Sequence, residues 1–352
     1  MKSDFSTCGG LEKATLRIAQ GFLDRGADLS ILTGDSASLP RWPKSLRLER
    51  YDRFVRNWIR EHQPDLIFGM ERTREQTHLR AGNGVHAAYL ETRGLFKRLT
   101  ALLSPFHAKI LELERTGFTH PRLQKIFTNS HMVKGEILRF YPVDPSKIEV
   151  IHNGVEWEEM QRDFDEGPER KVLFMREHGL DLSQFHFLFI GNGYARKGLK
   201  ELLYAFAETK EGHLSIVGKE SRESSYQALA ARLGLKGRVT FFGRQKNVRR
   251  FYQFADAVVI PSLYDPFANV TVEALAMGLF VVSSKSNGGH EILTDKNGAI
   301  ISDLFNRDSL TFALKEALSH PKTPMQALSI RKSVRNLDYS LQTKKLIDSC
   351  CL

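Results

Sequence analysis

Apolar residues along the chain recur in two alternating patterns. The segment 11–23 places its apolar side chains three and four positions apart, which predicts an amphipathic helix. Shorter, continuously apolar runs predict strands, and in the first half these lie at 27–32, 65–69, 125–128 and 148–151. Helices that alternate with apolar strands are typical of a parallel sheet covered by helices. The pattern therefore predicts an α/β fold.

The same alternation continues more regularly in the second half. It predicts strands at 185–191, 213–218, 239–243, 257–261 and 280–283, with helices at 200–209, 224–233, 248–254 and 269–277. The apolar composition of 257–261 suits a strand that is buried on both faces. We therefore expect a doubly wound sheet in each half, with ligands bound at the carboxyl ends of the strands.

A turn and a polar segment separate the two halves. His152-Asn153-Gly154-Val155 contains the turn-forming Asn-Gly pair, and an acidic stretch follows up to Glu169. We therefore expect a first domain over 1–155 and a second over 156–352, with the last helix crossing back. The first domain is expected to lack its opening strand, because residues 1–5 offer little apolar surface, and we interpret this as a mis-assigned start.

Composition narrows the class of protein. The 352 residues suffice for two α/β domains, and 41% hydrophobic residues is typical of a globular protein. No stretch reaches the roughly 20 apolar residues of a membrane-spanning helix, and no signal peptide is evident. Cys8, Cys350 and Cys351 suit neither a disulfide framework nor a metal site, which indicates a reducing cytoplasm.

The net charge of +10 favours an anionic partner. Nucleic acid, anionic lipid and a phosphorylated substrate all fit this charge, and a solvated basic surface without function is the alternative. No recognised motif supports nucleic-acid binding beyond the charge itself.

The most informative motif follows the strand predicted at 257–261. Residues 261–278 read PSLYDPFANVTVEALAMG and lead into a helix that begins near Asn269. The free N–H groups and the dipole of a helix N-terminus suit a diphosphate. Asp265 before the helix and Glu273 inside it would then accept hydroxyls of a sugar and a ribose. A capped helix with two incidental acids is the simpler explanation of the same residues.

A glycine-rich loop joins the strand at 185–191 to the following helix. It reads GNGYARKG over 191–198. Glycine lets the backbone approach a ligand, and Arg196 and Lys197 can neutralise a diphosphate leaving group. Taken alone, such a loop is usually a solvated turn.

Two further segments lie in the first half. The block RAGNGVHAAYL at 80–90 contains Asn83 and His86, and His86 by itself is more typical of a structural histidine. The segment 93–109 is basic and apolar at once. Five apolar side chains would enter a bilayer interface (Leu95, Leu99, Leu102, Leu103 and Phe106) while four basic ones meet anionic lipid (Arg93, Lys97, Arg98 and Lys109). Packing within the domain is the alternative.

At these motifs the chain resembles the family 4 glycosyltransferases of the GT-B fold. That family carries an acidic residue, seven others and a Glu, which here are Asp265 and Glu273, with Asp in place of the usual first Glu. The resemblance implies that Asp265 contacts the donor sugar and that Glu273 binds the ribose. It implies further donor-site contacts from Gly9, Gly10, Arg196, Lys197, Phe267, Asn269 and Val270, and it matches 286–291 to a loop near the nucleotide.

A block related to 80–90 forms the acceptor-side wall in similar transferases. The resemblance therefore places His86 and Asn83 near the transferred sugar, although Asn83 stands where Asp is common and cannot act as a base. The catalytic residues expected in this way are His86, Asn83, Asp265, Arg196 and Lys197, with no metal site.

The resemblance implies two Rossmann-like domains whose parallel sheets face across a cleft. It implies retaining transfer of a hexose from a nucleotide-diphosphate sugar without a metal ion or other cofactor. Within the family, the chain is most similar to lipopolysaccharide inner-core glucosyltransferases, which implies UDP-glucose, a lipid-linked saccharide acceptor and a place at the inner face of the cytoplasmic membrane. A nucleotide-sugar epimerase and a non-catalytic nucleotide-sugar-binding protein are the alternatives.

Overall fold

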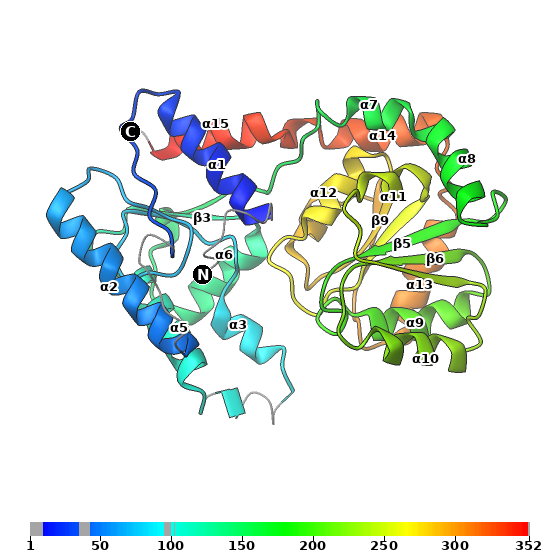
Figure 1. Cartoon of the computed structure of the whole chain (residues 1–352), viewed down its shortest axis with the longest axis horizontal. Helices are drawn as coiled ribbons and strands as arrows, with labels where there is room; N and C mark the ends of the chain where they lie inside the picture. The colour runs from blue at the N-terminus through cyan, green and yellow to red at the C-terminus, as the bar shows by residue number, and fades with distance from the viewer. Residues whose placement is uncertain (1–9, 35–42, 95–99, 102, 351–352) are drawn as a thin grey trace. The chain divides into compact units, whose positions relative to one another are not determined.

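The computed structural model describes residues 10–34, 43–94, 100–101 and 103–350. The chain forms two compact units, one of Met1–His152 with Gln342–Leu352 and one of Asn153–Leu341 (Figure 1). The sequence expectation put this boundary near residue 155. Each unit contains a parallel sheet with helices around it, so the predicted α/β class is confirmed.

The sheet of the second unit has six strands in the order β10-β9-β8-β5-β6-β7. All neighbours are parallel. The strands are β5 (His186–Ile190), β6 (His213–Val217), β7 (Val239–Gly243), β8 (Ala257–Ile260), β9 (Phe280–Ser284) and β10 (Gly298–Ile301). The strand order reverses between β5 and β8, and ligands of such sheets bind at the carboxyl ends beside this point.

Helices cover both faces of this sheet (Figure 1). One apolar cluster contains residues of α9 (Leu199–Thr209), α10 (Glu223–Arg232) and α13 (Arg307–Leu318), and the other contains residues of α8 (Gly167–Glu177), α11 (Arg249–Phe254), α12 (Asn269–Ala276) and α14 (Pro324–Ser333). Successive strand residues alternate between the clusters, with Phe187 in the first and Leu188 in the second. Burial on both faces explains why these strands are apolar throughout.

The first unit contains a four-stranded parallel sheet in the order β1-β2-β3-β4. Its strands are β1 (Phe68–Gly69), β2 (His78–Arg80), β3 (Lys125–Thr128) and β4 (Ile148–Val150), and its helices include α1 (Gly10–Leu23), α2 (Lys44–His62), α3 (His86–Glu91), α5 (Pro105–Phe118) and α6 (His131–Phe140). Ile18 and Phe22 of α1 share an apolar cluster with Ile347 of α15 (Tyr339–Cys350). A Cβ on Gly21 would lie 3.1 Å from Cγ1 of Ile347, so the small residue allows this close helix packing.

Short elements complete the described chain. They are α7 (Gln161–Asp165) and the 3-10 helices η1 (Pro145–Lys147), η2 (Gly288–Ile292) and η3 (Arg335–Leu337). No helix within the described ranges combines the length and the apolar composition that crossing a membrane requires.

The strand predicted at 27–32 is wrong. This segment is irregular in the structure, although Leu29 and Leu32 still pack against apolar clusters. A strand needs a neighbour for its N–H and C=O groups, and within the described residues β1 pairs only with β2. The strand predicted at 65–69 shrinks to Phe68–Gly69 for the same reason. The expectation about residues 1–5 lies outside the described residues.

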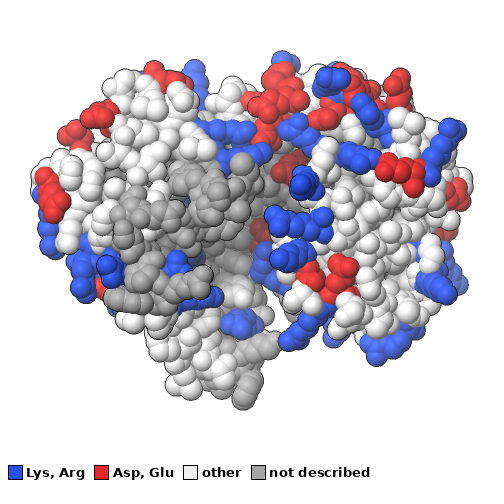
Figure 2. All heavy atoms as spheres, in the orientation of Figure 1, with Lys and Arg blue, Asp and Glu red and all other residues white. Residues whose placement is uncertain are grey.

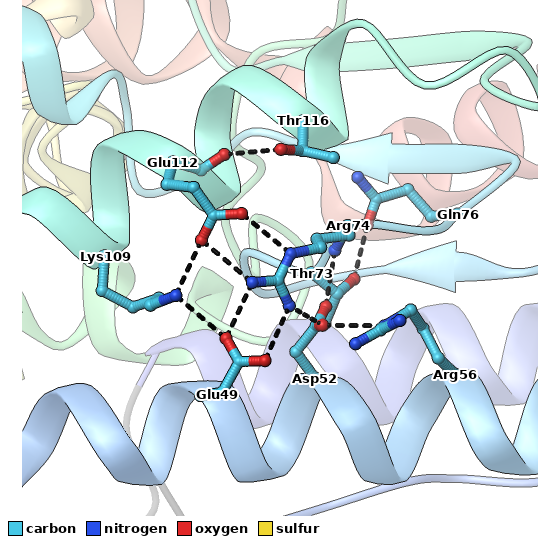
Figure 3. A network of polar contacts seen from close by, with 9 residues as sticks. All are labelled: Glu49, Asp52, Arg56, Thr73, Arg74, Gln76, Lys109, Glu112 and Thr116. Atoms are coloured by element: carbon cyan, nitrogen blue, oxygen red, sulfur yellow. Dashed lines mark hydrogen bonds and ion pairs between the residues drawn. The ribbon is translucent and has the colours of Figure 1, made fainter.

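A polar network joins α2, α5 and the segment before β2 (Figure 3). The guanidinium of Arg74 pairs with the carboxylates of Glu49, Asp52 and Glu112. Lys109 bonds Glu49 and Glu112, at 3.0 Å each. The hydrogen bond from Arg74 is the main cause that lowers the pKa of Glu49 from 4.5 to about 2. Lys109 is one of the four basic residues predicted to meet anionic lipid, and in the structure two carboxylates of the same unit hold its ammonium.

Candidate active site

Two loops of the second unit meet beside the point where its strand order reverses. The loop after β5 contains Arg196, whose carbonyl accepts from the N–H of Leu263 at 2.9 Å. The Nη1 of Arg196 donates to the carbonyl of Tyr264 at 3.0 Å. Gly198 has a φ of +73°, and a Cβ there would lie 1.8 Å from the carbonyl oxygen of Pro261. Only glycine allows this approach, so the Gly-rich loop is fixed against the loop that follows β8.

The same contact brings three charged side chains together. Oδ2 of Asp265 accepts from Nζ of Lys197 at 2.6 Å and from Nη1 of Arg196 at 3.1 Å. The side chain of Lys197 is 11% exposed and that of Arg196 is 43% exposed. The stem of Lys197 lies on Gly191, where a Cβ would come within 3.0 Å of its Cγ. The predicted residues Arg196, Lys197 and Asp265 therefore form one cluster.

Asn287 fixes the start of α12 beside this cluster. Its buried Oδ1 accepts from the N–H of Ala268 at 2.8 Å, and its Nδ2 donates to Oγ1 of Thr271 at 3.0 Å. The N–H of Asp265 donates to the carbonyl of Ser286, and the carbonyl of Asp265 accepts from Gly288, at 2.9 Å each. The loops after β8 and β9 are thus tied together, and residues 286–288 of the segment 286–291 make these contacts.

The predicted diphosphate contacts lie in the first turn of α12, which begins at Asn269 as expected. Oδ1 of Asn269 accepts from Nδ2 of Asn153 at 2.8 Å, which holds this turn to the first residue of the unit. Val270 follows in the same turn, where backbone N–H groups carry the positive end of the helix dipole. The side chain of Phe267 packs in the apolar cluster, and its carbonyl accepts from Asn153 at 3.4 Å.

Glu273 lies one turn further along α12. Its Oε2 accepts from the hydroxyl of Tyr252 on α11 at 2.7 Å. Tyr252 is buried, and burial together with the carboxylate raises the pKa of its phenol well above the usual value. The phenol therefore stays protonated and donates to Glu273. Tyr252 is absent from the predicted site residues, because a tyrosine on a short helix carries no local signal of a polar partner.

In the first unit, His86 begins α3 and is buried. Its Nε2 lies 2.9 Å from Nδ1 of His107, and its backbone N–H donates to Oε1 of Glu114 at 2.7 Å. Burial lowers the pKa of His86 from 6.5 to about 4, with further contributions from Arg72, His107 and Arg93. The imidazole is therefore uncharged at neutral pH.

Asn83 lies three residues earlier and is exposed. It lines a small pocket with Arg72, Arg80 and Glu114. Arg72 holds the loop in place, because its Nη2 donates to the carbonyl of Gly84 at 3.1 Å and its Nε to Glu114 at 2.7 Å. His86 and Asn83 thus lie three residues apart on one segment that Arg72 holds at Gly84. Gly9 lies outside the described residues, and Gly10 is the first residue of α1.

Comparisons with known proteins agree with these motifs. A family model described as "Glycosyl transferases group 1" matches residues 172–332, and one described as "Glycosyltransferase Family 4" matches residues 8–159. The chain belongs to the family 4 glycosyltransferases of the GT-B fold. The prediction of a glycosyltransferase is therefore confirmed.

Several curated proteins resemble this glycosyltransferase. It is 24% identical over 337 residues to the lipopolysaccharide glucosyltransferase WaaG of Escherichia coli strain K12, covering 88% of this chain and 86% of that protein. It is 23% identical over 340 residues to the lipopolysaccharide core biosynthesis glycosyltransferase LpsD of Rhizobium meliloti, covering 91% and 88%. An uncharacterized glycosyltransferase of Methanocaldococcus jannaschii is 31% identical over 201 residues, which cover 55% of this chain and 51% of that protein.

Solved structures share the fold of this glycosyltransferase. The crystal structure of WaaG, described as a glycosyltransferase involved in lipopolysaccharide biosynthesis, matches with a TM-score of 0.76 at 20% identity and covers 97% of this chain and 96% of that chain. The structure of Anabaena HepE in complex with UDP matches with a TM-score of 0.63 at 18% identity, covering 98% and 96%. At these identities the similarity establishes the fold.

Proposed function

We propose that this glycosyltransferase moves glucose from UDP-glucose to a lipid-linked saccharide such as lipopolysaccharide core, with retention of anomeric configuration and without a metal ion. The observation that carries the proposal is the cluster of Arg196, Lys197 and Asp265 beside the start of α12. Two cations and a helix N-terminus supply positive charge where a diphosphate leaving group would need it.

The positive charge of this cluster would assist the departure of the diphosphate. The bond between the anomeric carbon and the diphosphate oxygen breaks, and positive charge develops on the sugar. Arg196, Lys197 and the N–H groups at Asn269 and Val270 stabilise the departing negative charge, as preorganised donors do in other enzymes. The leaving oxygen accepts the proton of the acceptor hydroxyl on the same face, and the new bond forms there. No carboxylate nucleophile is required, in contrast to retaining hydrolases.

The remaining residues bind the two substrates. Glu273, oriented by Tyr252, accepts ribose hydroxyls of the donor, and Asp265 accepts hydroxyls of the transferred sugar. The uncharged His86 can accept a hydrogen bond from a sugar hydroxyl, and Asn83 contributes an amide beside it.

We place the enzyme at the inner face of the cytoplasmic membrane, where a lipid-linked acceptor is found. Within 93–109, Leu103 is 85% exposed, as an interfacial residue would be. Figure 2 shows Lys and Arg side chains in patches on the visible face, interspersed with Asp and Glu. The net charge of +10 would attract anionic lipid headgroups to the protein surface.

The relatives support the choice of substrates. One is a lipopolysaccharide glucosyltransferase and one a lipopolysaccharide core biosynthesis glycosyltransferase. The fold neighbour HepE has been crystallised with UDP and with UDP-glucose.

The test is a thermal-shift screen with UDP-, GDP- and ADP-sugars. A ligand that binds the folded state raises the melting temperature as its concentration passes Kd. We expect UDP-glucose to stabilise the protein, and Glu273→Ala and Lys197→Ala to abolish the shift. Glucose transfer to isolated lipopolysaccharide core should then persist in EDTA and yield the anomer of the donor. Lack of a shift with all three nucleotide classes would refute the donor site.

A further inference from the structure

The carboxylate of Asp265 occupies the hydrogen-bond donors that a diphosphate would use. A single oxygen, Oδ2, accepts from both Lys197 and Arg196. Asp265 is 8% exposed, so this charge has lost most of its water and depends on these two partners. The cluster carries two positive charges and one negative charge from these side chains.

We propose that Asp265 makes the donor site select a nucleotide sugar over the nucleoside diphosphate that remains after transfer. The inference rests on the proposed function, because it takes Arg196 and Lys197 as the diphosphate site. The carboxylate and the diphosphate compete for the same N–H groups, so binding of either weakens the other. Asp265 therefore weakens the binding of any diphosphate, and only a ligand that also carries the sugar recovers this binding free energy.

The offset comes from the sugar. When a diphosphate takes the cations, the carboxylate of Asp265 loses its donors in a site that is largely shielded from water, which is costly unless new donors appear. A nucleotide sugar brings hydroxyl groups that donate to a carboxylate at this position. UDP brings none. The carboxylate therefore regains Arg196 and Lys197 most easily when UDP leaves, and product release is favoured.

The backbone of Asp265 is held independently of its side chain. Its N–H donates to Ser286 and its carbonyl accepts from Gly288, at 2.9 Å each. Replacing the carboxylate by an amide of the same shape therefore leaves the loop in place. The amide also has no charge with which to compete for the two cations.

The experiment is isothermal titration of the wild type and Asp265→Asn with UDP and with UDP-glucose, without acceptor. We expect Asp265→Asn to bind UDP about tenfold more tightly, because a competing charge-assisted hydrogen bond is gone. UDP-glucose should change little, since the same substitution weakens the contact to the sugar. The preference for UDP-glucose over UDP thus falls about tenfold. Asp265→Glu keeps the charge and should keep the weak binding of UDP.

Asp256 provides a matched control in the same unit. It is also buried and accepts from a lysine, Lys171, at 2.9 Å, but it lies just before the amino end of β8, whereas the site lies at the carboxyl ends of the strands. Asp256→Asn should leave both affinities unchanged. Damage to the fold weakens binding, so tighter UDP binding by Asp265→Asn has no trivial explanation.

The outcomes separate the two proposals. Unchanged or weaker UDP binding by Asp265→Asn, with the wild type still binding UDP-glucose, overturns the inference alone. Equal tightening in Asp256→Asn overturns it as well, because the effect would then be general. If neither the wild type nor the variant binds UDP or UDP-glucose, the proposed donor site fails and the inference fails with it.

Discussion

Replacing Tyr252 by Phe removes one oxygen from a buried hydrogen bond that ends on Glu273. The hydroxyl lies 2.7 Å from Oε2, and Tyr252 is 1% exposed. A hydrogen bond to a charged group contributes about 1.5–3 kcal/mol. Since Glu273 is half-buried and can recruit water, we take the lower end, about 1.5 kcal/mol, as the loss of folding stability. This loss of folding stability alone would not show that Tyr252 has a role in binding.

The informative quantity is the preference for a ribose hydroxyl. If Tyr252 orients Glu273 toward the ribose, the wild type should prefer UDP over 2′-deoxy-UDP by about tenfold, the value of one hydrogen bond to a charged group. In Tyr252→Phe the carboxylate is less well oriented, and the preference should fall to about twofold. Isothermal titration of both nucleotides with both proteins gives the four affinities.

Tyr141 is the matched control for this measurement. Its buried hydroxyl also donates to a carboxylate, that of Glu114 at 2.8 Å, but in the first unit. Tyr141→Phe should lower stability by a similar amount and leave the preference for UDP unchanged. If Tyr252→Phe weakens UDP and 2′-deoxy-UDP by the same factor, Tyr252 has only a structural role and the reasoning is refuted.

Three other perturbations have expected outcomes. Gly198→Ala puts a Cβ 1.8 Å from a backbone oxygen and should lower the free energy of unfolding in urea by more than about 3 kcal/mol. Gly193 has a similar φ of +72° but nothing within 4 Å of its Cβ position, so Gly193→Ala should lower it by about 1 kcal/mol. Equal losses would contradict the packing argument. The pKa of His86 in the folded protein is about 4, below the usual 6.5. The uncharged imidazole therefore contributes at most about 3 kcal/mol to the free energy of unfolding. This contribution is complete above pH 6.5 and is lost as the pH falls toward 4. His86→Gln should flatten this part of the stability profile, and an unchanged profile would contradict the assignment. The pKa of Glu49 is lowered to about 2 from 4.5, so its contribution is complete above pH 4.5 and lost as pH falls toward 2; Glu49→Gln should remove that loss, and thermal melts between pH 2 and 5 test it.

Most elements of the second unit were predictable because each is a local pattern. The strand at 239–243 has the predicted bounds, and α9 begins one residue earlier than expected. In α9, Leu199, Leu202, Leu203 and Phe206 are all buried at the spacing of one helix face. These residues lie close together in sequence, so the period of apolar positions contains the information.

The candidate site was predictable where a motif combines several neighbouring residues. The glycines at 191–198 and the acidic pair Asp265 and Glu273 are such motifs, and the structure brings Arg196 and Lys197 to Asp265. The hydrogen bond of Tyr252 to Glu273 joins residues 21 positions apart on two helices. No sequence pattern signals it.

The sequence by itself determined the α/β class, the buried strands of the second unit and the glycines of the Gly-rich loop, because apolar periodicity and backbone conformation are properties of adjacent residues. Tertiary structure alone decided that 27–32 is irregular, since pairing needs a neighbouring strand that no local pattern provides. It also decided that Lys109 binds Glu49, 60 residues away. A charged side chain takes the partner that the fold brings within reach, and that partner is set by packing between distant segments.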